Sequence, residues 1–210
     1  MRFLPVVLAL LLLTGCAGTG DSAPASRSTP QEEGGALPVE FDGFRRVGNP
    51  LNFEGQPGGA GLGAGVRYAP ANGERIALTV YIYDRGRPRA PEGGASPDVL
   101  DELRTTTAEL NAAVRAGIYR SVKFNTGMNL GQGNVPTELR CLNFSMVQRD
   151  GTPTGDSVCV TVVNGRFMKV RLTVSTPPEP VMAGVLAIAI LQRFRGLGMQ
   201  NGTPASGLRT

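Results

Sequence analysis

Residues 139–175 read LRCLNFSMVQRDGTPTGDSVCVTVVNGRFMKVRLTVS and predict three consecutive β-strands. The three strand-like runs cover 139–148, 157–163 and 166–175. A turn-rich loop at 150–155 separates the first two runs, and Asn164-Gly165, a dipeptide typical of tight hairpins, separates the last two. Because loops this short join antiparallel neighbours, we expect a meander in which each strand pairs with the next.

A further strand is predicted at 76–83, where the sequence IALTVYIY alternates between two kinds of side chain. One face carries Ile76, Leu78, Val80 and Ile82, and the other carries Thr79, Tyr81 and Tyr83. A strand around 65–68 can pair with it through a tight turn at Asn72-Gly73. We expect the face that carries the tyrosines to pack under a helix, and a platform for a sugar or a peptide is the alternative.

Two helices are predicted beside the strands. Ser96 suits an N-cap, Pro97 suits the first helical position, and Gly117 suits the end of the helix. Between them, apolar residues recur at helical spacing: Val99, Leu103, Leu110 and Val114. The second helix, 181–194, is an apolar segment that is too short to cross a bilayer and better suited to burial. We therefore expect an α+β fold, in which two helices pack against an antiparallel meander sheet of about five strands.

The first residues of the chain form a short apolar run that ends in a cysteine. An apolar run at 4–13 is about ten residues long, which is the length of a signal-peptide core and about half of a bilayer span. The run ends in Leu13-Thr14-Gly15-Cys16, which resembles the lipobox of bacterial lipoproteins. The resemblance implies cleavage before Cys16 and attachment of lipid to this cysteine, which would anchor the chain to a lipid bilayer. An ordinary secretory signal followed by a coincidental cysteine is the alternative.

The same resemblance implies a location in the cell envelope. Residue 17 is alanine, whereas aspartate at this position resembles an inner-membrane retention signal, so we expect the outer membrane, with the domain facing the periplasm. We expect four regions: a signal peptide at 1–15, the lipidated cysteine and a disordered tether rich in small and polar residues at 16–37, a single α+β domain at 38–196, and a flexible tail at 197–210.

Two cysteines, Cys141 and Cys159, remain once Cys16 carries lipid. An oxidising compartment favours a disulfide between them. The expected strand register argues against this disulfide. A hairpin centred on the 150–155 loop pairs residues whose numbers sum to about 305, whereas the two cysteine numbers sum to 300, so the cysteines would not lie opposite each other. Three solutions remain open: a turn centred nearer Asp150, a bend or bulge at Cys141, or two free thiols.

The composition excludes several classes of chemistry. The chain contains no histidine, so a His-based triad, a histidine base and a histidine metal ligand are all impossible. The glycine-rich stretch 58–65 lacks the Gly-Lys-Ser/Thr sequence of a phosphate-binding loop. The formal net charge is +4, but the basic residues are spread along the chain, so we expect no nucleic-acid partner. We predict no catalytic residue, no metal site and no cofactor.

One group of basic residues lies in the last predicted strand. Lys169 and Arg171 share a face of that strand, and Arg166 lies beside them. A solvated strand face is the simplest interpretation. A surface that binds anionic lipid headgroups, peptidoglycan carboxylates or an acidic partner is the functional alternative.

Three functions agree with this sequence. The leading hypothesis is a non-enzymatic envelope lipoprotein that assists assembly or binds a partner, such as another envelope protein or peptidoglycan. A periplasmic carrier of a small ligand, with a pocket between sheet and helices, is the first alternative. A carboxylate-based glycan hydrolase is the second, and it needs two acids about 5–10 Å apart in a cleft. Its candidates Asp101, Glu102 and Glu109 lie on the first predicted helix, where we expect a solvated face.

Overall fold

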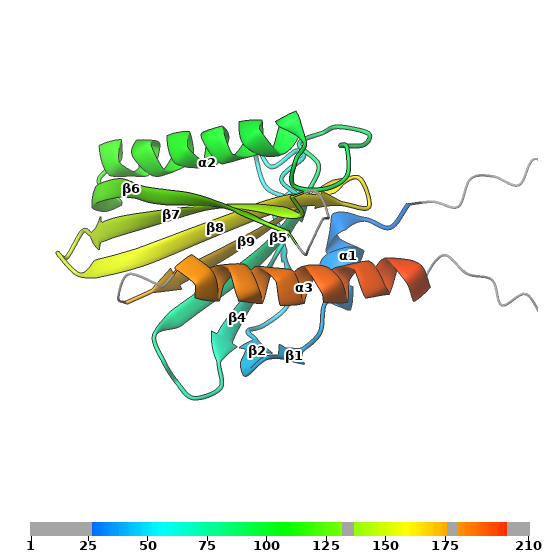
Figure 1. Ribbon diagram of the computed structural model, residues 1–210, viewed down its shortest axis with the longest axis horizontal. Helices are drawn as coiled ribbons and strands as arrows, with labels where there is room; N and C mark the ends of the chain where they lie inside the picture. The colour runs from blue at the N-terminus through cyan, green and yellow to red at the C-terminus, as the bar shows by residue number, and fades with distance from the viewer. Residues whose placement is uncertain (1–26, 132–136, 176–179, 201–210) are drawn as a thin grey trace, which may run out of the picture.

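The computed structural model describes residues 27–131, 137–175 and 180–200. Within these residues the chain forms one sheet of nine strands and three helices (Figure 1). The helices are α1 (Pro30–Ala36), α2 (Pro97–Arg115) and α3 (Pro180–Gln200). The strands are β1 (Glu40–Phe41), β2 (Phe44–Arg46), β3 (Leu51–Asn52), β4 (Ala64–Pro70), β5 (Ile76–Tyr83), β6 (Tyr119–Leu130), β7 (Leu139–Gln148), β8 (Pro153–Val163) and β9 (Arg166–Val174).

The nine described strands overturn the prediction of about five strands with two helices. The sheet order is β1-β2-β4-β5-β9-β8-β7-β6, with β3 also paired to β4, and every pairing in it is antiparallel. The pairing of β5 with β9 joins the β4–β5 hairpin to the meander of β6 to β9. The sequence analysis missed β1, β2 and β3 because two or three residues are too few to show an alternation.

The long strand β6 was missed for a different reason, because it is an edge strand whose residues are mostly exposed. A β-bulge between Phe124 and Thr126 also exchanges the two faces of the sheet to which its alternate side chains point. Before the bulge, Phe124 lies opposite Phe144; after it, Met128 lies opposite Cys141, which is on the other face of the sheet. The even-numbered residues of β6 therefore lie on one face of the sheet before the bulge and on the other face after it.

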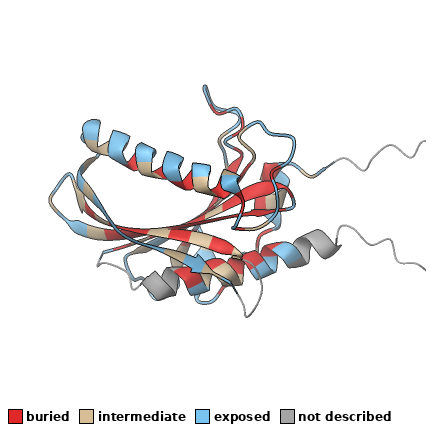
Figure 2. Cartoon of the chain, turned by 45° about the horizontal axis from the view of Figure 1, so that its top comes forward, coloured by how far each residue is buried: buried red, intermediate tan, exposed pale blue. Residues whose placement is uncertain are grey.

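The two long helices cover opposite faces of the sheet, and both faces carry apolar side chains (Figures 1 and 2). The α2 side buries residues from the helix and the sheet, namely Val99, Leu103, Leu110, Phe144, Val158, Val160, Val162 and Phe167. The α3 side buries Leu78, Val80, Ile82, Met168, Val170, Leu172, Ala187, Ile190, Leu191 and Phe194. No helix of the described residues combines the length and the apolar character that a membrane crossing requires.

Helix α2 confirms the predicted helix signals. The Ser96 hydroxyl accepts a hydrogen bond from the Asp98 amide, and Pro97 is the first helical residue. Gly117 follows the helix with a φ of +72°, a left-handed conformation that glycine adopts without steric cost. Val99, Leu103 and Leu110 are buried as expected.

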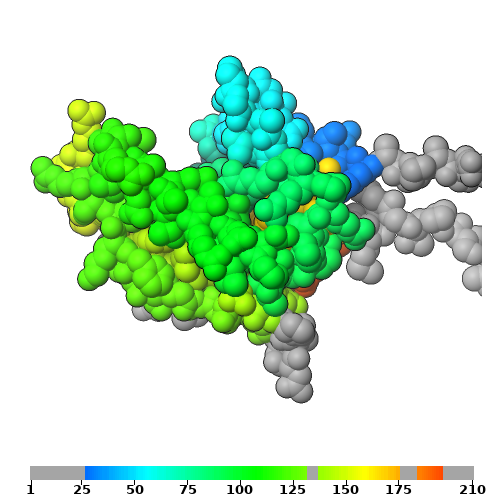
Figure 3. Space-filling model, turned by 90° about the horizontal axis from the view of Figure 1, so that it is seen from above, coloured from blue at the N-terminus to red at the C-terminus, as the bar shows by residue number. Residues whose placement is uncertain are grey.

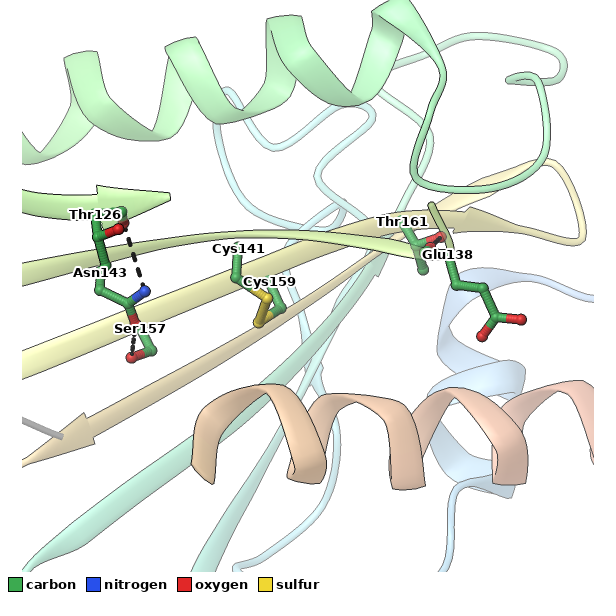
Figure 4. The surroundings of a disulfide bond; sticks show 7 residues. All are labelled: Thr126, Glu138, Cys141, Asn143, Ser157, Cys159 and Thr161. Carbon is green, nitrogen blue, oxygen red and sulfur yellow. Dashed lines mark hydrogen bonds between the residues drawn. A yellow bond between two sulfur atoms is a disulfide. The ribbon is translucent and has the colours of Figure 1, made fainter. Parts of the chain in front are cut away.

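The predicted disulfide is present between Cys141 and Cys159 (Figure 4). The two residues lie directly opposite each other in the β7–β8 pair, with their Cα atoms 4.0 Å apart. The Gln148 amide donates to the Thr152 carbonyl, and β8 already begins at Pro153. The turn is therefore centred near Asp150, which was the first of the three solutions that the sequence left open.

The prediction of a disordered tether at 16–37 is wrong for its last part. Residues 30–36 form α1, which begins with a reciprocal capping box between Thr29 and Glu32. Glu33 of this helix forms a buried ion pair with Arg166 of β9. The composition suggested a linker because it contains few apolar residues, but a buried charge pair and hydrogen bonds from Arg46 to the Gly35 and Leu37 carbonyls dock the segment on the sheet.

Several predicted features lie outside the described residues. They are the signal peptide at 1–15, the lipobox with Cys16, the following segment to residue 26, and residues 201–210 of the predicted tail. Helix α3 continues to Gln200, beyond residue 197, where the tail was predicted to begin.

Removing the disulfide tests its contribution to stability. We expect the double substitution Cys141→Ala/Cys159→Ala to lower the free energy of unfolding by about 3 kcal/mol, because the bond closes a loop of roughly 17 residues in the unfolded chain. Urea denaturation of the oxidised parent and the variant measures this difference. An unchanged midpoint with an unchanged slope would contradict the expected effect.

The buried ion pair of α1 can be tested by proteolysis. Glu33→Gln leaves Arg166 without its partner charge, so we expect trypsin to cut after Arg27 roughly tenfold faster than in the parent. Glu40→Gln is the matched control, because Glu40 pairs with Arg45 on the exposed surface. Equal cleavage rates in both variants would show that α1 is held by other contacts.

Candidate functional site

The side of the sheet that faces α2 carries a polar region on its central strands. Tyr81 of β5 lies opposite Lys169 of β9, and Thr79 lies opposite Arg171. The strand alternation places these side chains on the same face as Phe167, whose ring contacts the core under α2. The sequence analysis expected the Thr79 and Tyr81 face to lie under a helix, and the structure confirms this.

A cleft of about 250 Å³ lies between α2 and this part of the sheet. It is lined by Tyr81, Thr106, Glu109, Leu110, Ala113, Ile118, Tyr119, Val158, Lys169 and Arg171. A second hollow of about 170 Å³ is lined by Phe53, Leu62, Tyr81, Tyr83, Arg85, Glu109 and Lys169. Because Tyr81, Glu109 and Lys169 line both, the two hollows are neighbouring parts of one site. Figure 3 shows the molecule from the α2 side, with the segment before β4 (cyan) beside α2 (green).

An ion-pair network lies where the two hollows meet. The Glu102 carboxylate accepts hydrogen bonds from Arg85 Nε at 3.0 Å and Nη2 at 2.9 Å, and from Lys169 Nζ at 3.2 Å. The Glu109 carboxylate, about two turns later on α2, is 3.3 Å from Arg85 Nη2 and 3.9 Å from Lys169 Nζ. Lys169 Nζ also lies 5.5 Å from the centre of the Tyr81 ring and 5.3 Å from that of Tyr83.

The network determines the protonation state of Glu102. Burial acts to raise the pKa of this carboxyl, but the hydrogen bonds from Arg85 and the charge of Lys169 outweigh it, so its pKa lies below the ordinary value. Burial and the nearby Glu102 charge raise the pKa of the Tyr83 hydroxyl well above its ordinary value. Glu102 is therefore a buried anion, and Tyr83 beside it is a neutral phenol.

A second ion pair lies at the Tyr119 end of the cleft. Arg171 Nε donates to both oxygens of Asp156, at 3.0 and 2.8 Å, and its Nη2 donates to the Tyr119 hydroxyl at 3.3 Å. Burial acts to lower the pKa of Arg171, but the Asp156 charge outweighs it and the pKa is raised. Asp156 is fully buried and also accepts a hydrogen bond from Thr173. Arg171 is thus a permanent cation whose charge is balanced inside the protein.

The three residues of the predicted basic surface are in different places. Arg166 is buried against Glu33, Lys169 bonds Glu102, and Arg171 bonds Asp156. Lys169 and Arg171 both line the cleft. The three side chains therefore do not form the exposed cationic strand face that the sequence suggested, because each carries its own carboxylate partner.

Glu102 and Glu109, which the sequence named only as candidate acids of the hydrolase alternative, belong to the ion-pair network. The sequence analysis expected both on a solvated helix face, but the Glu102 side chain is only 3% exposed, while that of Glu109 is 53% exposed. The signal that could have found Glu102 is its position next to Leu103, on the side of α2 that carries the apolar stripe.

Two other observations concern possible sites elsewhere. The described residues contain no cluster of three or more Cys, Asp or Glu side chains that could hold a metal ion. A cavity of about 380 Å³ on the α3 side is lined partly by turn residues, among them Asp42, Asn72 and Glu74. No basic side chain is among its lining residues, so it offers less chemistry than the cleft under α2.

Comparison with known proteins adds no functional information. No protein-family model matches this chain, and no curated protein matches it. The function must therefore be argued from the cleft itself.

The buried carboxylate makes a testable contribution to stability. We expect Glu102→Gln to lower the free energy of unfolding by about 3 kcal/mol at pH 7, because it leaves two cations without their main partner. Since the folded-state pKa of Glu102 is depressed, this contribution is complete above its ordinary pKa of 4.5 and is lost as the pH falls through the folded-state value. The difference between parent and variant should therefore shrink below pH 4.5.

The measurement is chemical denaturation at several pH values, with Asp101→Asn as the control. Asp101 is exposed on the same helix and pairs only with Arg104 among the contacts of the described residues, so its loss should change stability by less than about 0.5 kcal/mol. A pH-independent difference for Glu102→Gln would contradict the ionised state of this carboxyl.

Proposed function

We propose that this chain is a membrane-anchored lipoprotein of the bacterial cell envelope, whose domain binds a small ligand in the cleft under α2. The observation that carries the binding role is the cleft itself, in which aromatic, aliphatic and charged side chains converge. Its size suits a small molecule better than a protein surface. The proposal thus combines the expected envelope binding module with the small-ligand alternative.

The side chains of the cleft favour binding over hydrolysis. Glu102 and Glu109 both contact Arg85 Nη2, at 2.9 and 3.3 Å, so their carboxylates are as close as a glycan hydrolase would need. A general acid needs a carboxyl with a raised pKa, whereas the pKa of Glu102 is lowered. Glu102 is also too buried to reach a sugar ring. The pair therefore suits charge balance better than acid catalysis.

One buried polar group also supports a ligand in the cleft. Thr105 and Thr107 donate their hydroxyls to helix carbonyls four residues earlier, at 3.0 Å in both cases. The Thr106 hydroxyl between them is buried at the cleft and has no hydrogen-bond partner among the described residues. Buried polar groups without partners are uncommon, and a bound water, ion or ligand can supply the missing partner.

The anchor rests on the lipobox Leu13-Thr14-Gly15-Cys16. The Cys141–Cys159 disulfide agrees with an oxidising compartment such as the periplasm. Arg27 donates to the carbonyls of Pro88 and Asn164, so the chain is already docked on the domain at residue 27. Ten residues lie between this point and Cys16, and the eleven steps along the chain span at most about 40 Å, so a lipidated Cys16 would hold the domain close to the membrane surface.

Substitution of the cysteine tests the anchor. We expect the parent to sediment with membranes and to be released by detergent, and Cys16→Ser to be recovered in the soluble fraction, because lipid chains supply the binding energy. Ala17→Asp keeps the lipidated cysteine and is the matched control; it should stay with membranes and shift toward the inner membrane. Sedimentation of Cys16→Ser with membranes, like the parent, would refute the anchor.

A further inference from the structure

We infer that the cleft under α2 binds a small monocarboxylate with an apolar body, and that its carboxylate takes the place of the Glu109 carboxylate between Arg85 and Lys169. The inference rests on the proposed function only in taking this cleft as the ligand site. It does not depend on the anchor at Cys16.

The charged side chains at the junction of the two hollows need one further negative charge for balance, and this charge can be exchanged. Arg85 and Lys169 contribute two positive charges, and Glu102 contributes one negative charge that is buried and held at 2.9–3.2 Å. Without Glu109 the group would carry one unbalanced positive charge next to the rings of Tyr81 and Tyr83. An unbalanced cation in a half-buried site attracts an anion of single charge.

Glu109 provides that anion under conditions that favour exchange. Its side chain is 53% exposed, and its contacts of 3.3 and 3.9 Å are longer than those of Glu102. Half-exposed ion pairs of this kind contribute little to stability, because water solvates both groups when they separate. The Glu109 side chain can therefore turn into solvent at small cost, whereas Glu102 cannot. Glu109 occupies the position that an external carboxylate would take.

The neighbouring hollow fits the apolar body of such a ligand. It has a volume of about 170 Å³ and its walls include the side chains of Phe53, Leu62 and Tyr83. A cavity of about 150 Å³ lined by apolar groups holds a benzene ring. Glycine at residue 65 leaves room for the Phe53 ring in this position, since an added Cβ there would lie 2.7 Å from Phe53 Cε2. The hollow therefore suits a phenyl-sized group attached to the carboxylate.

The position of the cleft explains why side chains must recognise the ligand. Its floor consists of β5, β9 and β8, which are central strands paired on both sides. Their backbone groups already bond each other, so an extended peptide cannot add to the sheet here. A ligand with two or more negative charges would also be repelled by Glu102 and by the displaced Glu109. A single carboxylate, either of a small organic acid or at the C-terminus of a short peptide, satisfies both conditions.

The test measures binding of four probes to the full-length protein in mild detergent by calorimetry. Phenylacetate represents a small acid, and N-acetyl-phenylalanine represents a peptide C-terminus. Phenylacetamide and N-acetyl-phenylalaninamide are their uncharged counterparts. The key variant is Glu109→Gln, which removes the internal competitor, and the matched control is Asp101→Asn, which removes one exposed negative charge from the same helix without contacting the cleft.

We expect at least one of the two acids to bind, and to bind Glu109→Gln about three- to fivefold more tightly than the parent. Asp101→Asn should bind it as the parent does, and the amides should bind at least tenfold more weakly than the acids. Lys169→Gln should lose binding while its melting transition shows that it is folded. Which acid binds more tightly distinguishes an organic acid from a peptide C-terminus.

Three results would overturn the inference: equal binding of acids and amides, weaker or unchanged binding of the acid to Glu109→Gln, or no binding of either acid to the parent and to Glu109→Gln. Fractionation of Cys16→Ser is a separate measurement. A failed anchor with carboxylate binding intact would leave the inference standing, and a confirmed anchor without carboxylate binding would refute the inference alone.

Discussion

The buried carboxylate of Glu102 is the constraint on which the arrangement of the α2 side depends. A carboxylate that is 3% exposed must have cationic partners, and Arg85 and Lys169 supply them from the end of β5 and from β9. The N-terminal half of α2 packs directly on the sheet through Val99 and Leu103. Beside these apolar contacts, the sheet presents Lys169 and Arg171, whose long polar side chains fill the interface less completely. The cleft lies where the apolar contacts between α2 and the sheet end and the charged side chains of the sheet begin.

The sequence could predict the elements whose signal is local. The alternation of 76–83, the serine cap of the helix at Pro97 and the Asn164-Gly165 turn each depend on a few neighbouring residues, and the structure has β5, α2 and the β8–β9 hairpin there. It could not predict features that depend on distant partners. Strand β6 is exposed and changes face at a bulge, and α1 is docked by the contact of Glu33 with Arg166, 133 residues away. Neither the bulge in β6 nor the ion pair of α1 leaves a periodic pattern in the sequence.

In the candidate site, too, the sequence predicted what depends on neighbouring residues and did not predict what depends on distant ones. The sequence brought Tyr81 and Tyr83 to one face and Lys169 and Arg171 to one face, which is correct because strand alternation is local. The sequence did not reveal that Lys169 and Arg171 are paired with acids, because the neutralising carboxylates come from other elements. Asp156 belongs to β8, and Glu102 belongs to α2. A run of alternating basic residues therefore indicates a basic surface only when no acid lies on the elements packed against it, which one strand alone cannot reveal.

The ends of the domain differ in a way that bears on the proposed anchoring. Helix α1 and the C-terminal end of α3 lie at one end of the sheet, while the β7–β8 turn and the C-terminal end of α2 lie at the other (Figure 1). Ile118 and Tyr119, which line the larger hollow, directly follow α2 and so belong to the second end. A membrane anchor at Cys16 would hold the α1 end toward the lipid, because Arg27 is docked there on the β8–β9 turn. The part of the larger hollow that Ile118 and Tyr119 line would then lie at the end of the domain away from the membrane. Because the chain is docked on the domain at Arg27, an anchor at Cys16 would keep the α1 end within about 40 Å of the membrane surface.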